Sequence, residues 1–434
     1  MLVPTLSGER AAPEAIASDG ESGAAIPEGT PAVSVNEGAP PVTINEGAPE
    51  VAVGDLGTEE PTVSEEPMTT PEPALPFSIE VLTRAGIGGG NSTGWPNVGA
   101  ARGPFDWTSG PFARVTLIVD LESSCYPFES WLNNPPPAGQ NWPANCDAFD
   151  RNFNVFVEDA AAAPRLPFEV VHAITPFGGP EHLEVDLTDL ANVLPGAHQL
   201  RVAIDSYADP AGLVTGSNGG WTVSARLLVD PGPAPRTVLA AVPLYAGRLQ
   251  AGDPAPVVSF VAPPGTTGGR LEYRTSGHGQ GAQGAQCIGP AEEFCSRRHL
   301  IQLDGVEVQD INPIRVDCDT LCTLTHYGPP AAGFDYCLEN PGGLPDSVRA
   351  PRANWCPGSM TAPFSWSDLP ALATPGPHTF GFEISQIEAG GNWLVSAIYY
   401  AFGTLPASYP AGADFQFSSP GAVTFSRAVS SSGT

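Results

Sequence analysis

The sequence contains no lysine, and its 18 basic residues face 47 acidic ones, which gives a formal net charge of −29. This charge argues against nucleic acid as a partner, because the phosphates would be repelled, and against anionic membrane surfaces. No apolar run reaches the length of a transmembrane helix. The first residues, MLVPTLSGERAAPEA, lack the basic start and apolar core of a signal peptide. We expect a soluble, acidic protein with no membrane span.

Clustered metal ligands are also scarce. The seven histidines are scattered, no His-x-His pair occurs, and Met360 is the only methionine after residue 76, which argues against a copper site. No Cys-x-x-Cys pair exists, and His326 is the only histidine near Cys318 and Cys322, so zinc is the weaker interpretation of the cysteines. We expect no metal and no cofactor, and we interpret His299 as a loop or strand residue.

The cysteines are even in number and lie close to one another along the chain. Such spacing predicts short-loop disulfides and an oxidising compartment, hence a secreted, periplasmic or cell-surface protein. The expected pairs are Cys125–Cys146, Cys287–Cys295, Cys318–Cys322 and Cys337–Cys356.

Residues 1–75 differ in composition from the rest of the chain. They contain 14 acidic residues, a single arginine and no aromatic residue, and the unit NEGAP begins at Asn36 and again at Asn45. Such a segment buries too little apolar surface to offset the entropy lost on ordering. We predict a disordered acidic spacer, with a partner-binding motif as the alternative.

From about residue 76 onward, short runs alternate between apolar and polar residues and end at Gly, Pro or Asp, which is typical of β-strands. No amphipathic helix of ten or more residues is evident. The stretch VDPGPAPR, residues 229–236, separates two sets of runs. We predict an all-β protein with two antiparallel eight-stranded jelly-roll (β-sandwich) domains side by side, at 76–232 and 233–405. Residues 406–434 form a Ser/Gly/Ala-rich tail that can add an edge strand. The strand runs are 77–85, 114–122, 154–159, 168–174, 183–190, 198–205, 221–230, 237–246, 256–263, 269–275, 298–305, 378–384 and 393–402.

An Asp-Arg pair stands at the entrance of one such run, in NWPANCDAFDRNFNVFV. Within a strand, Asp150 and Arg151 would point to opposite faces. If both precede the strand, in a loop anchored by Cys146, they can converge on one polar ligand. The alternative is a surface salt bridge, which contributes little to stability.

Several motifs together resemble the bacterial peptide-N-glycosidase F family over roughly residues 80–405. They are CDAFDRNFNVFVED, HAITPF and LEVDLTDL in the first half, and CIGPAEEFCSRRH and PRANWCPG in the second. The resemblance implies two jelly rolls and a metal-free enzyme that hydrolyses the amide bond between asparagine and the innermost N-acetylglucosamine. Its substrates are N-glycosylated proteins or peptides, and we expect a monomer. The alternatives are a glycan-binding module without turnover and a structural surface protein.

The resemblance also implies roles for individual residues. Asp150 matches the principal catalytic carboxylate, and Glu293 the second one, which acts through a water molecule. Arg151 matches an arginine that binds the core sugar. Arg352 matches the arginine of the family's Arg-x-x-Trp-Cys-Pro-Gly segment, and Trp355 is the aromatic residue of that segment. Without the resemblance, Glu293 would be interpreted as an exposed charge on a disulfide-bounded loop.

Some positions depart from the family pattern. Asp205 stands for a glutamate and Tyr207 for a tryptophan, and Asp reaches roughly 1.5 Å less far than Glu. The family has a tryptophan in the glycine-rich loop that reads SGHGQGAQGAQ here, and His278 lies near that position. Phe294 stands where the family has another tryptophan. We expect Asp205 to act in catalysis and the other three to contact substrate, with altered tolerance of fucose on the innermost sugar.

Overall fold

The computed structural model describes residues 75–88, 98–107, 110–125, 146–159, 166–206, 219–279, 287, 289, 291–327, 329, 333–339 and 347–404. The predicted tail and, apart from Leu75, the predicted acidic spacer lie outside the described residues. Within the described part, no helix combines the length and apolarity needed to cross a membrane.

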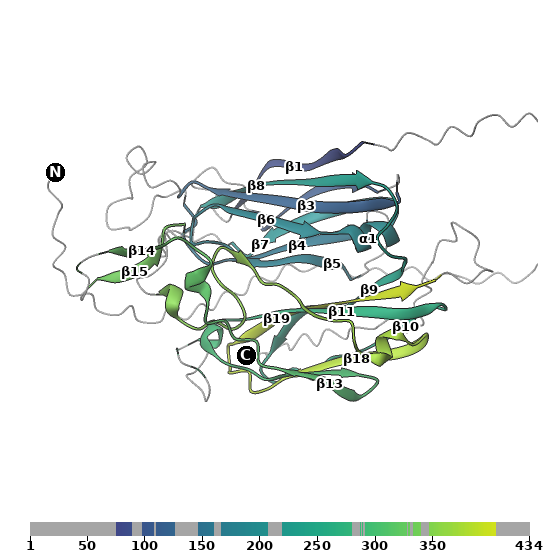
Figure 1. The fold of residues 1–434 in the computed structure, drawn as a ribbon. Coiled ribbons are helices and arrows are strands. Elements are labelled where there is room, and N and C mark those ends of the chain that lie inside the picture. The colour runs from purple at the N-terminus through teal and green to yellow at the C-terminus, as the bar shows by residue number, and fades with distance from the viewer. Residues whose placement is uncertain are drawn as a thin grey trace, which may run out of the picture. The chain divides into compact units, whose positions relative to one another are not determined.

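The first sandwich packs two antiparallel sheets face to face (Figure 1). One sheet has the order β1-β8-β3-β6, and the other has the order β5-β4-β7-β2, with the short strand β16 added beside β5. Its eight own strands among the described residues are β1 (Phe77–Gly88), β2 (Ala100–Asp106), β3 (Phe112–Ser123), β4 (Asn152–Asp159), β5 (Phe168–Ile174), β6 (Glu181–Asp186), β7 (Ala197–Ile204) and β8 (Gly220–Pro231).

Alternation along each strand builds the core of this sandwich. In β4, Phe153, Val155 and Val157 are almost completely buried, while the residues between them are half-buried. Both sheets send such residues into one apolar cluster, which is the reason that the period-two runs form a sandwich.

The second sandwich repeats the plan with the sheet orders β10-β18-β12-β13 and β17-β11-β19-β9. Its core contains Trp393, Tyr273, Phe380 and Phe382. A separate hairpin, β14-β15, lies outside both sandwiches (Figure 1). The strands of the second half are β9 (Val238–Gln250), β10 (Val257–Ala262), β11 (Thr266–His278), β12 (His299–Leu303), β13 (Val306–Ile311), β14 (Leu324–Tyr327), β15 (Phe334–Cys337), β16 (Ser359–Met360), β17 (Phe364–Trp366), β18 (Gly376–Ile384) and β19 (Asn392–Gly403).

The two sandwiches share a buried interface. Ile398 and Tyr400 of β19 and Ala241 of β9 belong to the apolar cluster of the first sandwich, although their strands belong to the second. In addition, β16 pairs with β5, with Met360 opposite Ala173. The sheet that contains β11 and β19 is therefore covered on both faces.

The predicted fold class is confirmed: the described chain is built of antiparallel sheets in two sandwiches. The predicted run 183–190 is too long, because β6 ends at Asp186 and a short helix, α1 (Thr188–Val193), follows it. The predicted limits of the two domains remain a proposal.

Four disulfides are present, but two of the predicted pairings are wrong. The bonds are Cys125–Cys146, Cys287–Cys295, Cys318–Cys356 and Cys322–Cys337. The first two agree with the predicted pairs, whereas Cys318–Cys322 and Cys337–Cys356 do not form.

Backbone pairing explains the exchanged partners. Arg315 and Arg352 exchange two backbone hydrogen bonds of 2.7 and 2.8 Å, so the segment that leads to Cys318 lies beside the segment that leads to Cys356. In the hairpin, Cys337 lies opposite Leu324, close to Cys322. Neighbours in sequence therefore face different elements, and proximity along the chain does not decide the pairing.

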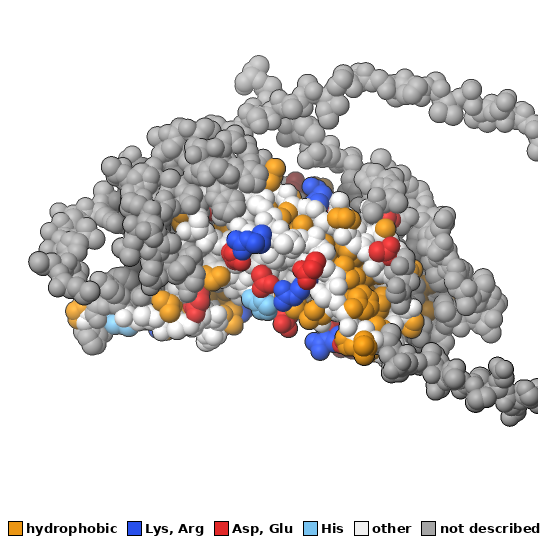
Figure 2. Space-filling model, turned by 90° about the horizontal axis from the view of Figure 1, so that it is seen from above, with side chains coloured by type: hydrophobic (Ala, Val, Ile, Leu, Met, Phe, Trp, Pro, Cys, Tyr) orange, Lys and Arg blue, Asp and Glu red, His pale blue; other side chains and the backbone are white. Residues whose placement is uncertain are grey.

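Charges of opposite sign are intermixed on the visible surface. Figure 2 shows arginine side chains lying beside acidic ones rather than in patches of one sign. Pairs such as Arg298–Asp310, at 2.6 Å, illustrate this arrangement. Because such pairs are exposed, each contributes little to stability.

Candidate active site

Asp150 lies in the short segment between the disulfide Cys125–Cys146 and the first residue of β4. Thr175 holds the backbone on both sides of it. The Arg151 N–H donates to Thr175 Oγ1 at 2.8 Å, and the Thr175 hydroxyl donates to the Phe149 carbonyl at 2.9 Å. The Asp-Arg pair thus precedes the strand, as convergence on one site requires.

Arg151 turns into the protein rather than toward solvent. Its Nε lies 3.1 Å from each carboxylate oxygen of Asp147, whose side chain is fully buried. The Trp221 indole donates a further bond of 3.4 Å to Asp147. Burial raises the pKa of Asp147, against the lowering effect of Arg151. The predicted contact of Arg151 with a sugar stays a prediction.

Glu293 lies in a short 3-10 helix, η2 (Glu292–Phe294), which is followed directly by Cys295. The two successive glutamates have different surroundings: the Glu292 side chain is fully buried, whereas that of Glu293 is 27% exposed. Glu293 Oε1 lies 3.4 Å from Arg352 Nη1. Of the two, Glu293 is the one available to a ligand.

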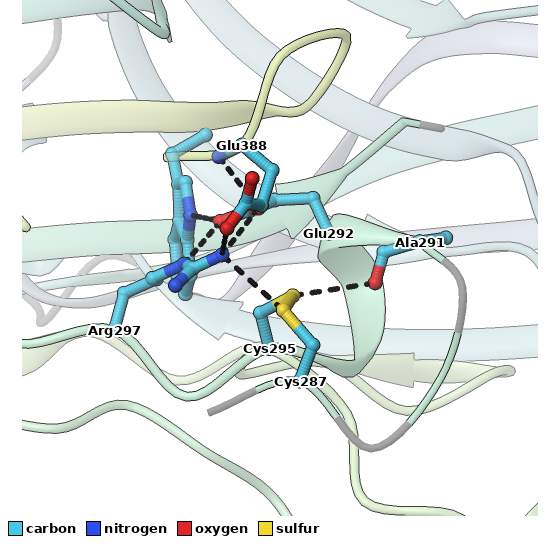
Figure 3. Close-up of a disulfide and its surroundings, with 7 residues drawn as sticks. Cys287, Ala291, Glu292, Cys295, Arg297 and Glu388 are labelled. Carbon is cyan, nitrogen blue, oxygen red and sulfur yellow. Dashed lines mark hydrogen bonds and ion pairs between the residues drawn. A yellow bond between two sulfur atoms is a disulfide. The ribbon is translucent and has the colours of Figure 1, made fainter. Parts of the chain in front are cut away.

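Glu292 anchors η2 through a fully occupied carboxylate (Figure 3). It accepts hydrogen bonds from Arg297 Nε and Nη2 at 2.7 and 2.9 Å, from the Trp393 indole at 2.9 Å and from the Glu388 N–H at 3.2 Å. Because Arg297 is also fully buried, this ion pair fixes the position of η2.

One group of potential metal ligands occurs among the described residues. Cys287, Glu292 and Cys295 place their ligand atoms within 4.8 Å of one another. The two sulfurs form a disulfide, and the carboxylate is paired with Arg297 (Figure 3). All three groups are therefore already engaged in interactions within the protein.

The segment that carries Arg352 is tied to the end of β11. Gly277 N–H donates to the Ala353 carbonyl at 2.9 Å, and the Trp355 indole donates to the Gly277 carbonyl at 3.0 Å. A Cβ on Gly277 would lie 2.7 Å from that of Ala353, so this close approach requires glycine. Ala353 N–H also donates to the Glu293 carbonyl at 2.8 Å, which joins the two loops directly.

Two aromatic rings hold the Arg352 guanidinium. Its Cζ lies 4.5 Å from the centre of the Phe294 ring and 4.8 Å from that of Trp355. The side chain is 4% exposed, and its Nε has no hydrogen-bond partner among the described residues. Such a buried, unsatisfied donor is costly unless a ligand completes its bonding.

The charges of Asp150, Glu293 and Arg352 act on one another. Burial raises the pKa of Asp150 to about 6, although Arg352 lowers it. Burial and the charge of Asp150 raise the pKa of Glu293 to about 7, again opposed by Arg352. Burial lowers the pKa of Arg352, while the two carboxylates raise it. The structure thus brings these three predicted residues together from both sandwiches.

Asp205 lies at the surface, directly after β7. It is 55% exposed, accepts a hydrogen bond of 3.0 Å from Asn152 Nδ2, and lies 3.7 Å from Arg248 Nη2 of the second sandwich. Its predicted catalytic role is not tested by this position. Tyr207 lies outside the described residues.

Phe294 and His278 both pack against site residues. Phe294 lies under Arg352, and the His278 ring stacks on Trp355 with centroids 5.8 Å apart. Trp355 itself is 1% exposed, so its predicted contact with substrate, like those of Phe294 and His278, stays a prediction.

Sequence reasoning missed Thr175, Asp147 and Glu292, which hold Asp150, Arg151 and Glu293 in place, respectively. Thr175 lies within HAITPF and Asp147 within CDAFDR, so both belong to motifs that had been recognised. The signal for Glu292 was its place beside Glu293, but the sequence does not say which glutamate is buried.

A family model matches part of the second half of the chain. Residues 247–400 match the family model described as the C-terminal domain of peptide-N-glycosidase F. The chain resembles the peptide-N-glycosidase F family, as its motifs indicated. No curated protein sequence gives a significant match.

Solved structures show the peptide-N-glycosidase F fold as well. Recombinant peptide:N-glycanase F has a TM-score of 0.56 at 17% identity, with 78% of this chain and 99% of that chain covered. PNGase F, a glycosylasparaginase from Flavobacterium meningosepticum, gives 0.56 at 16% identity over the same shares of 78% and 99%. PNGF-II gives 0.55 at 18% identity and covers 76% of this chain, but this chain spans only 66% of PNGF-II, slightly less than two thirds. At these identities the likeness shows a shared fold.

Proposed function

We propose that this protein is a peptide-N-glycosidase. It hydrolyses the amide bond between asparagine and the innermost N-acetylglucosamine of N-linked glycans, and it releases the glycan and leaves aspartate. The observation that carries the proposal is the electrostatic grouping of Asp150, Glu293 and Arg352 at the interface between the sandwiches.

The pair of carboxyl groups suits amide hydrolysis. With pKa values of about 6 and about 7, one group is ionised while the other keeps a proton near neutral pH. Asp150, with the lower value, takes a proton from a water molecule whose oxygen attacks the amide carbonyl carbon. The protonated partner, Glu293, gives its proton to the nitrogen as the C–N bond breaks.

Arg352 supports the same step. Its guanidinium is held by ring contacts at 4.5 and 4.8 Å, and its Nε is buried with no partner among the described residues. Donors that are already in place stabilise the negative charge that develops on the carbonyl oxygen. Four disulfides favour an oxidising compartment, and we propose that the protein acts as a secreted or periplasmic monomer.

The decisive experiment incubates the full chain with a denatured N-glycoprotein in ¹⁸O-labelled water. Amidase chemistry places ¹⁸O in the new aspartate and releases the whole glycan, as mass spectrometry detects. Asp150→Asn is expected to abolish release, whereas the exposed control Asp230→Asn retains it. Absence of release at any pH, with glycan binding intact, would instead support the glycan-binding module.

A further inference from the structure

Two histidines from different sandwiches meet at one serine hydroxyl. His172 Nε2 of β5 lies 2.5 Å from Ser276 Oγ of β11, and His278 Nε2 lies 2.6 Å from the same oxygen. His172 Nδ1 lies 2.9 Å from Glu169 Oε1. Glu169, His172 and Ser276 are 4%, 1% and 0% exposed. A continuous row of hydrogen bonds therefore crosses the interface between the sandwiches.

The backbone is shaped to align this row. Residues three apart on a regular strand point to opposite faces, but the pairing of β5 with β4 skips Val170, which forms a β-bulge. The bulge brings Glu169 and His172 to the same face. Ser276 and His278, two residues apart on β11, share a face by ordinary alternation.

The surroundings keep Glu169 ionised. Burial alone would raise the pKa of Glu169, but the charge and hydrogen bond of His172, with Ser396 and Arg274, hold it below its usual value. Asn154 Nδ2 also donates to Glu169 at 2.5 Å. An ionised Glu169 accepts only, so the proton on His172 stays on Nδ1.

The surroundings of His278 disfavour a second positive charge. Burial, together with the charges of His172 and Arg248, holds the pKa of His278 well below its usual value. The two imidazoles therefore carry at most one extra proton between them.

The Ser276 hydroxyl has one hydrogen, so it donates to one of the two imidazoles and accepts from the other. When His172 is charged, Nε2–H donates to Ser276 Oγ, and the hydroxyl donates to His278 Nε2, so the His278 proton lies on Nδ1. When the proton leaves, it departs from His278 Nδ1. The hydroxyl proton then moves to His278 Nε2, and the Nε2 proton of His172 moves to Ser276 Oγ. His172 is then neutral, and His278 Nδ1 has become an acceptor.

We propose that Ser276 is a positioning residue that passes a proton between His172 and His278. As a result, His278 Nδ1 contacts the bound glycan as a hydrogen-bond donor at lower pH and as an acceptor at higher pH. The contact with glycan rests on the proposed function. His278 stacks on Trp355 at 5.8 Å, and Trp355 lies 4.8 Å from the Arg352 guanidinium carbon, so the ring borders the candidate active site. Apart from Ser276, no described side chain hydrogen-bonds to this ring.

The test follows the tautomers of the full chain by NMR with ¹⁵N-labelled histidine between about pH 5 and pH 8, the range in which histidine titrates. The variants His172→Gln and His278→Gln assign the signals. We expect the proton of His278 to move from Nδ1 to Nε2, and the Nε2 signals of His172 and His278 to change with one shared midpoint. A single His278 tautomer throughout this range in the unmodified protein overturns the proposal, whatever the variants do.

Two serine variants then test the link. Ser276→Ala is expected to abolish the shared midpoint, whereas Ser276→Thr keeps the hydroxyl and the shared midpoint, and the exposed control Ser259→Ala changes nothing. A shared midpoint that persists in Ser276→Ala overturns the role of Ser276.

The ligand contact is tested separately with chitobiose. We expect a change in the His278 Nδ1 signal on addition of chitobiose, and no change would overturn the contact. None of these measurements requires turnover, so they fail or succeed independently of glycan release.

Discussion

Arg352 Nη1 lies 3.4 Å from Glu293 Oε1, and the same guanidinium lowers the pKa of Asp150. One positive charge therefore favours the ionised form of two candidate catalytic carboxyl groups, against the effect of burial. These groups come from different sandwiches, so the site exists only where the sandwiches meet.

Replacement of Arg352 by methionine is the direct test of this control. Because Arg352 lowers the pKa of both carboxyl groups, its loss raises both values further. The base then needs a higher pH to ionise, so the acidic limb of kcat/KM should move up by about one pH unit. We also expect a decrease in kcat of about 100-fold.

Arg315→Met is the matched control for this measurement. Its side chain pairs with Asp317 at 2.7 Å, while its backbone supports Arg352. The control should keep the pH profile of the unmodified protein. An acidic limb that stays in place in Arg352→Met would show that the charge does not act on the base.

Asp150→Asn should stabilise the protein while removing activity. The pKa of Asp150 is raised to about 6, so the folded state binds this proton more tightly than the unfolded state, whose value is about 4. Stability is therefore lost as pH rises between these values, and the variant avoids this loss. Two pKa units correspond to about 3 kcal/mol, so we expect a gain of about this size at pH 8 and almost none at pH 4, measured by urea unfolding.

Asp147→Asn should lower stability, although burial raises the pKa of Asp147 as it does that of Asp150, because the variant leaves the buried Arg151 guanidinium without its carboxylate partner. Its carboxylate is the buried partner of Arg151, and a buried charge without its partner costs about 3 kcal/mol or more. Urea unfolding at pH 7 measures this loss. Equal stability of the Asp147 and Asp150 variants would contradict the different environments described above.

Two of the three disulfides of the second half, Cys318–Cys356 and Cys322–Cys337, should also separate function from stability. Serine at both Cys318 and Cys356 removes the bond next to Trp355, so we expect a loss of about 3 kcal/mol and a decrease in kcat. Serine at both Cys322 and Cys337 opens only the β14–β15 hairpin and should leave kcat within about twofold. Unfolding curves and glycan-release rates measure both, and equal losses of kcat would contradict the distinction.

The sequence predicted strands well where the period-two pattern was complete. The run FSIEVLTRA, for example, forms the first part of β1. It missed β2 because AARGPFD contains Gly and Pro and has no regular alternation. This strand is fixed by its pairing with β7, with Gly103 opposite Leu200. Such pairing is a tertiary property that a local pattern does not contain.

The polar face of β11 marks a second limit of sequence reasoning. Arg274, Ser276 and His278 alternate with apolar or small residues, and such a pattern ordinarily predicts a solvent-exposed face. Instead, Ser276 is fully buried against the first sandwich. The pattern establishes that the strand has two different faces, but a second domain decides what covers the polar one. The candidate carboxylates were found only because the family motifs mark them.

Glu181 offers a test of stability remote from the proposed chemistry. It opens β6 opposite Leu121, is 6% exposed, and neither carboxyl oxygen has a hydrogen-bond partner among the described residues. Burial raises the pKa of Glu181 well above its usual value, so the folded state loses stability as pH rises above the unfolded value of about 4.3.

Glu181→Gln has nearly the same shape but cannot ionise. Urea unfolding should therefore show a gain of about 1–2 kcal/mol at pH 8 that disappears by pH 4. The exposed control Glu184→Gln, 58% exposed on the same strand, should show no such gain. A gain of equal size at both pH values would mean that burial of the charge is not the cause.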